Sequence, residues 1–314
     1  MDSHVFGPVP SRRLGRSLGV DLVPYKTCTY DCIYCQLGTT TCKTTERREW
    51  VPLDEVLEDL KAALDSRPDV TTLSGSGEPT LHCGLSDLIG GIKSLTDVPV
   101  AVLTNGSLLW DPAVRSGLRE ADLVVPSLDA GDERLFQRVN RPHEDITFER
   151  MVDGLAAFRQ EFSGRYWLEV LLLGGITAVP AEVERIAEIA RRIGPDCVHL
   201  NTAIRPPADA AARPVPKADL ERLAAAFDPG ATVIADYPDT PAEGEFAARR
   251  GDVLNLLSRR PCTVEDIAGG LGLHRNEVVK YVQELVDERL LSASAADGRV
   301  YYAATGQGPD RDGP

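Results

Sequence analysis

Short apolar runs and longer amphipathic segments alternate along the chain from residue 17 to residue 227. Apolar runs such as 98–103 and 166–173 are typical of buried strands. The segments between them carry apolar residues three and four positions apart, as helices that bury one face do. The pattern predicts strands at 17–24, 70–73, 98–103, 123–125, 166–173 and 197–200. It predicts helices at 53–64, 85–95, 112–118, 133–139, 148–162, 183–193 and 218–227.

Strands that alternate with helices in this way form parallel sheets joined by right-handed crossovers. Six such units are expected, and the alternation stops near Phe227. An open, partial (βα)6 barrel over residues 1–230 therefore fits better than a closed barrel of eight units. Ligand sites in such barrels lie at the carboxyl ends of the strands.

A second, smaller unit is expected after a linker at 231–250, which is rich in Ala, Pro, Asp and Glu and contains one short strand at 232–234. Helical patterns begin at 253, 264 and 274, and the second is preceded by the capping sequence Thr263-Val264-Glu265-Asp266. Apolar stretches at 291–295 and 300–303, joined by Asp297-Gly298, predict a hairpin. Three helices and a hairpin predict a winged helix-turn-helix domain at 251–304, followed by a disordered tail at 305–314.

Charge limits the classes of partner. The net charge of −14 argues against tight non-specific binding to nucleic acid. The predicted winged helix has six basic and eight acidic residues, which argues against tight binding to duplex DNA and favours a docking role or a role in covering the open side of the barrel. Residues 1–50 are the exception, with seven basic and five acidic residues, and are expected to be solvated or to attract an anionic substrate or an acidic electron donor.

Composition also bears on location. No run of about 18 apolar residues predicts a membrane span. The first residues lack the basic and then apolar pattern of a secretory signal, so a cytoplasmic protein is expected. An odd number of cysteines, seven, indicates ligands and free thiols rather than a disulfide framework.

Three of these cysteines lie close together in TCTYDCIYCQL, where Cys28, Cys32 and Cys35 are spaced C-x3-C-x2-C with Tyr34 before the third. Thiolates favour zinc or iron–sulfur clusters. A structural zinc site needs four ligands, and Cys42 is the next cysteine available. A four-iron cluster held by three cysteines leaves one iron open to another molecule, which is a catalytic arrangement. Three unrelated buried thiols and a zinc site completed by Cys42 are the alternatives.

Polar and glycine residues follow the predicted strands. Each is ordinary turn chemistry when taken alone, but together they stand where a barrel binds its ligand. They are Ser76-Gly77-Glu78, Asn105 in Thr104-Asn105-Gly106, Ser127-Leu128-Asp129, Glu169 with Gly174-Gly175, and Asn201.

The cysteine motif resembles the C-x3-C-x-aromatic-C signature of the radical S-adenosylmethionine (SAM) superfamily. The resemblance implies a [4Fe–4S] cluster on Cys28, Cys32 and Cys35, with SAM chelating the open iron and Tyr34, the aromatic residue of the motif, among the cofactor-binding residues. It also implies reductive cleavage of SAM to a 5′-deoxyadenosyl radical, with an electron donor such as a flavodoxin or ferredoxin.

The same resemblance implies roles for the residues after the strands. Ser76-Gly77-Glu78 is similar to the Gly-Gly-Glu element that binds the SAM amino group, with Ser76 replacing the first glycine. Ser127-Leu128-Asp129 is similar to the ribose-contacting segment of the molybdopterin-cofactor cyclase branch, and Thr104-Asn105-Gly106 also matches that branch. Glu169, Gly175 and Asn201 correspond to ribose or adenine contacts, and Arg141 is a candidate for the SAM carboxylate.

Residues 7–15, GPVPSRRLG, together with the cysteine motif and Gly-x-Gly-Glu-Pro-Thr, resemble the wyosine-synthase-like iron–sulfur oxidoreductases over about residues 5–230. Wyosine synthases carry extra amino-terminal cysteines, and none precedes Cys28 here, so tRNA modification does not follow from the resemblance. The remaining cysteines, Cys42, Cys83, Cys197 and Cys262, are expected to be ordinary thiols, with a second cluster as the alternative. His82 is expected to pack at a helix start or to exchange a proton near the site.

Two hypotheses remain. The first is a radical SAM enzyme acting on an RNA base, a peptide or protein, or an anionic metabolite, with no catalytic side chain identified. The second is an iron–sulfur redox sensor that regulates transcription through its winged helix.

Overall fold

The computed structural model describes residues 3–11, 13–228, 230–235, 250–271, 273, 275–296 and 298–305. Its strands are β1 Val5–Ser11, β2 Gly15–Val20, β3 Thr27–Cys28, β4 Cys42–Lys43, β5 Val70–Leu73, β6 Val100–Thr104, β7 Leu123–Pro126, β8 Arg165–Leu172, β9 Cys197–Thr202, β10 Thr232–Val233, β11 Leu291–Ala296 and β12 Arg299–Ala304. Its helices are α1 Leu53–Ala63, η1 Leu64–Ser66, η2 Pro79–Leu81, α2 Leu85–Leu95, α3 Pro112–Gly117, α4 Glu133–Val139, α5 Phe148–Glu161, α6 Pro180–Ile193, α7 Lys217–Ala224, α8 Arg250–Arg259, α9 Val264–Leu271 and α10 Arg275–Asp287.

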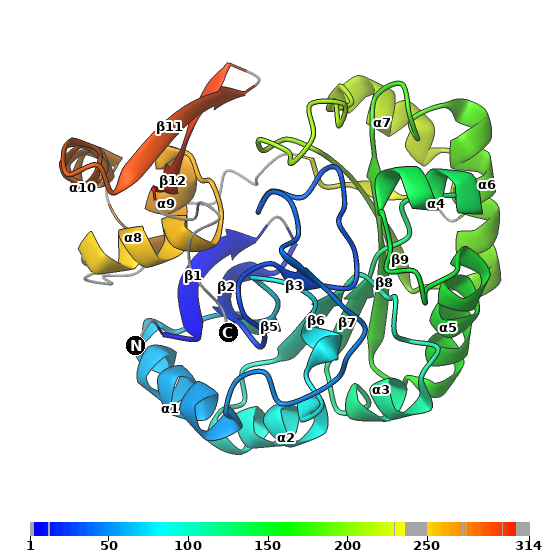
Figure 1. Ribbon diagram of the computed structural model, residues 1–314, viewed down its shortest axis with the longest axis horizontal. Helices are drawn as coiled ribbons and strands as arrows, with labels where there is room; N and C mark the ends of the chain where they lie inside the picture. The colour runs from blue at the N-terminus through cyan, green and yellow to red at the C-terminus, as the bar shows by residue number, and fades with distance from the viewer. Residues whose placement is uncertain are drawn as a thin grey trace.

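An eight-stranded sheet forms the centre of the molecule, in the order β1-β2-β5-β6-β7-β8-β9-β10. Strands β2 to β10 of this sheet pair in parallel, and β1 is antiparallel to β2. Figure 1 shows the sheet curving around the centre, with α1, α2, α3, α5 and α6 on its outer side. The predicted α/β fold with a mostly parallel sheet is confirmed, and the sheet is open because β1 and β10 are its edges.

Strand β1 is the main element that the hydrophobic pattern does not predict. It contains Gly7, Pro8 and Pro10, residues that disfavour a central strand but are tolerated at a sheet edge. The pairing with β2 shifts register between Phe6 and Val9, which accommodates the prolines. The first predicted strand, 17–24, is also displaced, since β2 ends at Val20 and the following residues already belong to a loop.

The principal core lies between the sheet and the outer helices. Helix α6 shows why: Val183, Ile186 and Ala190 recur at helical spacing, and all three are buried against the sheet. The helix ends where Gly194 adopts φ +70°, a conformation that favours glycine, and donates its N–H to Ala190 O. Each βα unit repeats this arrangement and thereby fixes where the carboxyl end of its strand lies.

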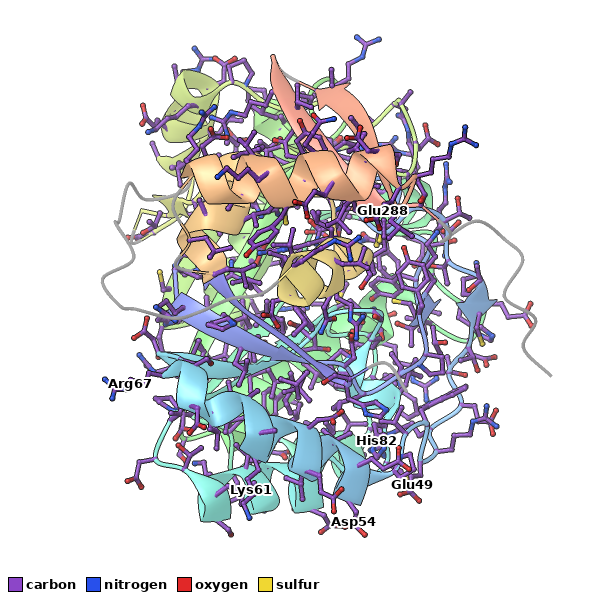
Figure 2. All side chains as sticks on the ribbon, turned by 90° about the vertical axis from the view of Figure 1, so that its left-hand side faces the viewer. Glu49, Asp54, Lys61, Arg67, His82 and Glu288 are labelled. Atoms are coloured by element: carbon purple, nitrogen blue, oxygen red, sulfur yellow. The ribbon has the colours of Figure 1, made fainter. Side chains whose placement is uncertain are left out.

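The carboxyl-terminal module, defined here as α8–α10 with the β11–β12 hairpin, packs on β1. Phe6 and Val9 of β1 join the buried cluster that contains Val253, Leu256 and Ile267 of the module. Figure 2 shows the module, with Glu288 labelled, at one end of the molecule and α1, with Asp54 and Lys61 labelled, at the other. The predicted Asp297 turn, most of the linker (236–249) and the tail beyond residue 305 lie outside the described residues.

Among the described helices none is both long and apolar enough to span a bilayer.

Candidate functional site

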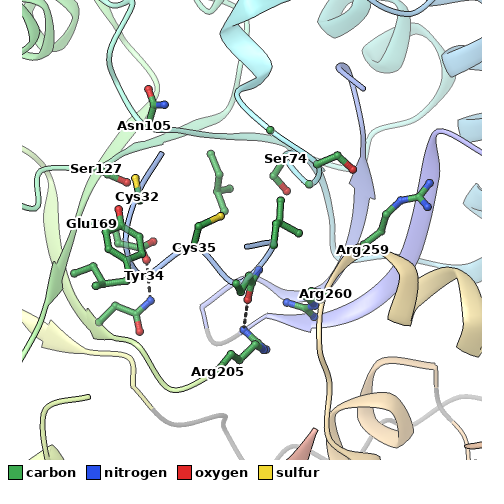
Figure 3. Close-up of a pocket in the computed structure, with 18 of the residues that line it drawn as sticks. Cys32, Tyr34, Cys35, Ser74, Asn105, Ser127, Glu169, Arg205, Arg259 and Arg260 are labelled. Carbon is green, nitrogen blue, oxygen red and sulfur yellow. Dashed lines mark hydrogen bonds between the residues drawn. The ribbon is translucent and has the colours of Figure 1, made fainter. Parts of the chain in front are cut away.

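A cavity of about 420 Å³ opens at the carboxyl ends of the parallel strands. All three clustered cysteines line it, as do residues that follow β5, β6, β7 and β9 (Figure 3). The sequence placed these residues together only through the rule that barrel ligands bind at strand carboxyl ends. In the structure these residues line one cavity.

The cysteines stand on a loop, residues 21–43, that we call the cysteine loop. Its turns are closed by Cys35 N donating to Cys32 O at 3.1 Å and Gly38 N donating to Cys35 O at 3.2 Å. Its middle is tied to the end of α4 by Ile33 N, which donates to Val139 O at 2.9 Å. The loop is therefore positioned by the barrel on both sides of its thiols.

Two amides approach the thiols directly. Asn105 Nδ2 lies 3.5 Å from Cys28 Sγ, and Asn140 Nδ2 lies 3.6 Å from Cys32 Sγ. Burial, reinforced by the negative charge of Glu78, raises the pKa of Cys28 to about 12. Burial likewise raises the pKa of Cys35, against hydrogen bonds from the loop backbone and the charge of Lys26. A bound metal supplies the positive charge that lets such thiols ionise.

The donor set suits a cluster better than one ion. Within the described chain, no three His, Cys, Asp or Glu side chains are placed to hold a single metal ion. Cys42, the fourth ligand of the zinc alternative, is exposed on β4. Three thiols around one cavity, without a fourth, fit a [4Fe–4S] cluster that keeps an iron for another ligand.

Glu78 is buried and holds the turn after β5 in place. Its Oε1 accepts from Thr80 N at 3.0 Å, from Thr80 Oγ1 at 2.6 Å and from Thr104 Oγ1 at 2.6 Å. Its Oε2 accepts from Asn105 N at 2.8 Å. Burial raises the pKa of Glu78, and these hydrogen bonds oppose the rise. The carboxylate thus joins β5 to β6 beside Cys28.

At Ser76 and Gly77, the backbone of this turn lies directly against the cysteine loop. Ser76 O accepts from Lys26 N at 2.6 Å, and Ser76 N donates to Asp21 Oδ1 at 2.5 Å. A Cβ on Gly77 would lie 1.8 Å from Thr27 O, so only glycine allows the two backbones to come so close.

Asp129 holds the middle of the cysteine loop through Tyr34. Its buried carboxylate accepts hydrogen bonds from the Tyr34 hydroxyl, from Asn140 Nδ2 at 2.9 Å and from Leu171 N at 3.0 Å. Burial raises the pKa of Asp129, against these three hydrogen bonds. Ser127, two residues earlier, lines the cavity.

Glu169 and Asn201 face the barrel interior from neighbouring strands. Asn201 Nδ2 donates to Glu169 Oε1 at 2.8 Å, and Arg13 Nη1 pairs with Glu169 Oε2 at 2.5 Å. Both strand residues line the cavity, as predicted from their positions.

Two predicted residues are not brought there. Arg141 is exposed and pairs with Asp209 at 2.7 Å, and Gly175 is an exposed turn residue with φ +71°; neither lines the cavity. His82 is fully buried, with Nε2 2.9 Å from Val51 O and Nδ1 accepting from Gly84 N, so it packs at the start of α2.

Several cavity residues have no counterpart in the sequence-based prediction: Lys26, Arg205, Arg259 and Arg260 line the cavity, and Asn140 contacts a thiol. Asn140 immediately precedes Arg141, so the correct loop was identified but not the residue. The Arg259-Arg260 pair entered the prediction only as charge, because a sequence does not show which helix end faces the barrel.

Comparisons with known proteins agree with this geometry. A family model described as the radical SAM superfamily matches residues 22–200. A UPF0026 protein of Methanocaldococcus jannaschii is 32% identical over 95% of this chain and 94% of its own length. A protein of Brachyspira hyodysenteriae named GTPase Obg is 40% identical over 96% of this chain, which spans only 45% of that relative.

Among solved structures, a radical SAM methyltransferase from Sphaerobacter thermophilus superposes with a TM-score of 0.53 and 17% identity, covering 71% of this chain and 67% of that one. At this level of identity the likeness concerns the fold alone.

Proposed function

The chain belongs to the radical SAM superfamily and to the UPF0026 family, and from this we propose that it is an enzyme that cleaves SAM reductively. The observation that carries the proposal is the meeting of Cys28, Cys32 and Cys35 with the Ser76–Glu78 turn around one cavity. Superfamily membership implies a [4Fe–4S] cluster and SAM; the three cysteines are the residues that would hold the cluster.

When bound, the cluster would supply one electron to SAM, whose carbon–sulfur bond would break to give methionine and a 5′-deoxyadenosyl radical able to remove hydrogen from a substrate. The role of the protein is to position the cysteine thiols and to enclose the bound cofactors. Asn105 and Asn140 orient the thiols of Cys28 and Cys32. The backbone N–H of Glu78 holds the loop at Thr27, and Asp129 holds it at Tyr34.

The proposed SAM site extends from the Ser76–Glu78 turn, past Asn105 and Ser127, to Glu169 and Asn201, all of which line the cavity. Arg141 and Gly175 are left out of it, because both lie away from the cavity. The narrower likeness to wyosine-synthase-like oxidoreductases stays a prediction, as does an electron donor such as a flavodoxin or ferredoxin.

For the carboxyl-terminal module we propose a winged helix that closes the barrel's open side. Its core merges with β1, and its Arg259 and Arg260 reach the cavity. The alternative, a redox sensor that reads DNA, is supported by neither the family model nor the structural likeness reported above.

The test is anaerobic reconstitution of the full chain with iron and sulfide, followed by reduction, addition of SAM and assay for 5′-deoxyadenosine. We expect the product from the wild type and its loss in Cys28→Ala. Cys83→Ala is the matched control, because Cys83 is exposed and lies outside the cavity. Full-rate cleavage by Cys32→Ala would refute the site assignment.

A further inference from the structure

The cavity carries a charge opposite to that of the protein. The chain has a net charge of −14, yet the charged side chains that line the cavity among the described residues are mostly basic. Glu78 and Glu169 are the acids. The basic residues are Arg13, Lys26, Arg205, Arg259 and Arg260.

Two of these arginines already have charged partners. Arg13 pairs with Glu169 at 2.5 Å, and Arg259 pairs with Asp21 at 2.6 Å. Both pairs hold the structure together: the first spans the barrel interior, and the second joins α8 to the start of the cysteine loop. Arg205 and Arg260 are the other two arginines of the cavity wall.

Arg260 is the least satisfied member of the group. It follows the last residue of α8 and points into the cavity (Figure 3). Its Nε and Nη2 are buried, and neither donates a hydrogen bond to any described residue. The guanidinium has a side-chain hydrogen bond with Cys262, but this leaves Nε and Nη2 without an acceptor. Buried polar groups in proteins nearly always have partners, and leaving such groups unsatisfied is costly. Such an arrangement indicates an acceptor that binds from outside the chain.

Arg205 lies on the same wall. It follows β9, its residue exposure is 8%, and its Nη1 donates to Gln36 Oε1 at 3.1 Å, beside Cys35. The loop that carries it is fixed to the module, because the Tyr301 hydroxyl donates to Ile204 O at 2.8 Å. Both arginines act on one buried thiol: their charges oppose the burial that raises the pKa of Cys262.

Two guanidinium groups near one another repel unless an anion lies between them. Arginine presents its N–H groups as a planar fork that matches the oxygens of phosphate or carboxylate, and such charge-assisted bonds are among the strongest in proteins. Two cations match a phosphate dianion, whereas the carboxylate of SAM carries only one negative charge.

We propose that Arg205 and Arg260 bind a phosphate group of the substrate, so that the enzyme acts on a small phosphorylated metabolite. This rests on the radical SAM function proposed above and adds the class of substrate. The module then contributes directly to substrate recognition, through Arg260.

The test measures binding of inorganic phosphate to the reconstituted full chain with SAM present, by calorimetry at constant ionic strength with chloride as the reference anion. We expect wild type to bind phosphate, and Arg260→Ala and Arg205→Ala each to bind it about tenfold or more weakly. Arg260→Lys keeps the charge but not the planar fork of N–H groups, so its phosphate affinity should lie between those of wild type and Arg260→Ala. Arg191→Ala is the matched control. It removes the same charge, but at an exposed position on α6.

Equal phosphate affinity in wild type and Arg260→Ala would overturn the proposal, as would the absence of phosphate binding by wild type. Loss of SAM binding in Arg260→Ala with phosphate binding retained would assign the arginine to the SAM carboxylate instead. Circular dichroism of each variant checks that it is folded. Because the titration requires no turnover, it is decisive even if wild type fails to cleave SAM.

A second measurement tests the source of the phosphate. Small-metabolite, peptide and RNA fractions of a cell extract are added separately to the SAM-cleavage assay. We expect the small-metabolite fraction to increase formation of 5′-deoxyadenosine and to lose this effect after phosphatase treatment. Stimulation that resists phosphatase, or that comes only from the peptide or RNA fraction, would contradict the proposed substrate class.

Discussion

Gly77 is the residue at which the turn after β5 comes closest to the cysteine loop. Its importance was attributed from the sequence to SAM binding, but the structure adds a steric reason, the 1.8 Å approach of any Cβ to Thr27 O. The carbonyl belongs to the backbone next to Cys28, so it has no side-chain freedom with which to move away. A residue expected to bind a cofactor is thus also needed to place the thiol.

We predict that Gly77→Ala lowers the free energy of unfolding by about 3 kcal/mol, because overpacking forces the cysteine loop to shift. It should also reduce the iron retained after reconstitution. Gly90→Ala is the control, since a Cβ there meets nothing within 4 Å, and alanine in the middle of α2 should add up to about 1 kcal/mol. Denaturant unfolding and iron analysis check both variants. Equal stability of the two would contradict the steric argument.

Protonation of His199 makes the stability of the folded protein depend on pH. Burial, and then the positive charge of Arg13, lower its pKa to about 4, against an ordinary value of 6.5. The unfolded imidazole therefore takes up its proton at a higher pH than the folded one, and stability is lost as the pH falls from about 6.5 towards 4.

The variant His199→Phe removes this titration while keeping an aromatic ring against Trp167, whose ring centroid lies 5.0 Å away. We predict that its free energy of unfolding changes less than that of wild type between pH 6.5 and pH 4. Denaturant curves across that interval measure it. A parallel loss of stability in both proteins would show that other groups control the pH response.

At the scale of elements, the hydrophobic pattern predicts helices α1 to α7 and most parallel strands of the large sheet, but it displaces β2 and misses the short parallel pair of β3 and β4. Helix α2 and helix α4 begin and end where the pattern placed them, because each has a clear apolar stripe. The pattern does not predict strand β1, because its prolines lack the N–H donors that a central strand needs. An edge strand can form without those donors. The sequence does not predict that Arg205 and Arg260 line the same cavity, because only tertiary packing brings the loop after β9 close to the end of α8.

Strand β1 serves two cores at once, and Phe6 shows this. Its side chain is 6% exposed, lies against Gly19 of β2 and belongs to the buried cluster of the module. We predict that Phe6→Ala costs about 3–5 kcal/mol and increases amide exchange in both β1 and α9. Leu95→Ala, at an exposed position, is the control. Hydrogen exchange read by mass spectrometry checks it; faster exchange in β1 alone would mean that the module holds its place without this contact.

At the scale of the molecule, the ion pair of Arg259 and Asp21 connects the module to the site. Asp21 is 6% exposed, and its Oδ1 accepts from Ser76 N while its Oδ2 accepts from Arg259 Nε at 2.6 Å. Burial raises the pKa of Asp21, and the arginine opposes the rise. One carboxylate therefore links α8, the cysteine loop and the turn after β5.

We predict that Arg259→Met costs about 3–5 kcal/mol, because it leaves a buried carboxylate without its cation. Asp21→Asn combined with Arg259→Met should cost less than the sum of the two single changes, by at least about 1 kcal/mol. Urea unfolding of the four proteins measures this coupling. Strict additivity would show that the two side chains contribute to stability independently.

The seating of the module on β1 has a consequence for how the protein is made. Strand β1 emerges from the ribosome before every other described strand, whereas α8 and the residues that follow it emerge after the whole barrel. A barrel that folds during synthesis would present its cysteines through a side that Arg259 and Arg260 later cover. Iron and sulfide would have their widest access to the thiols during that interval, so the order of synthesis would favour loading of the proposed cluster before the module covers the site.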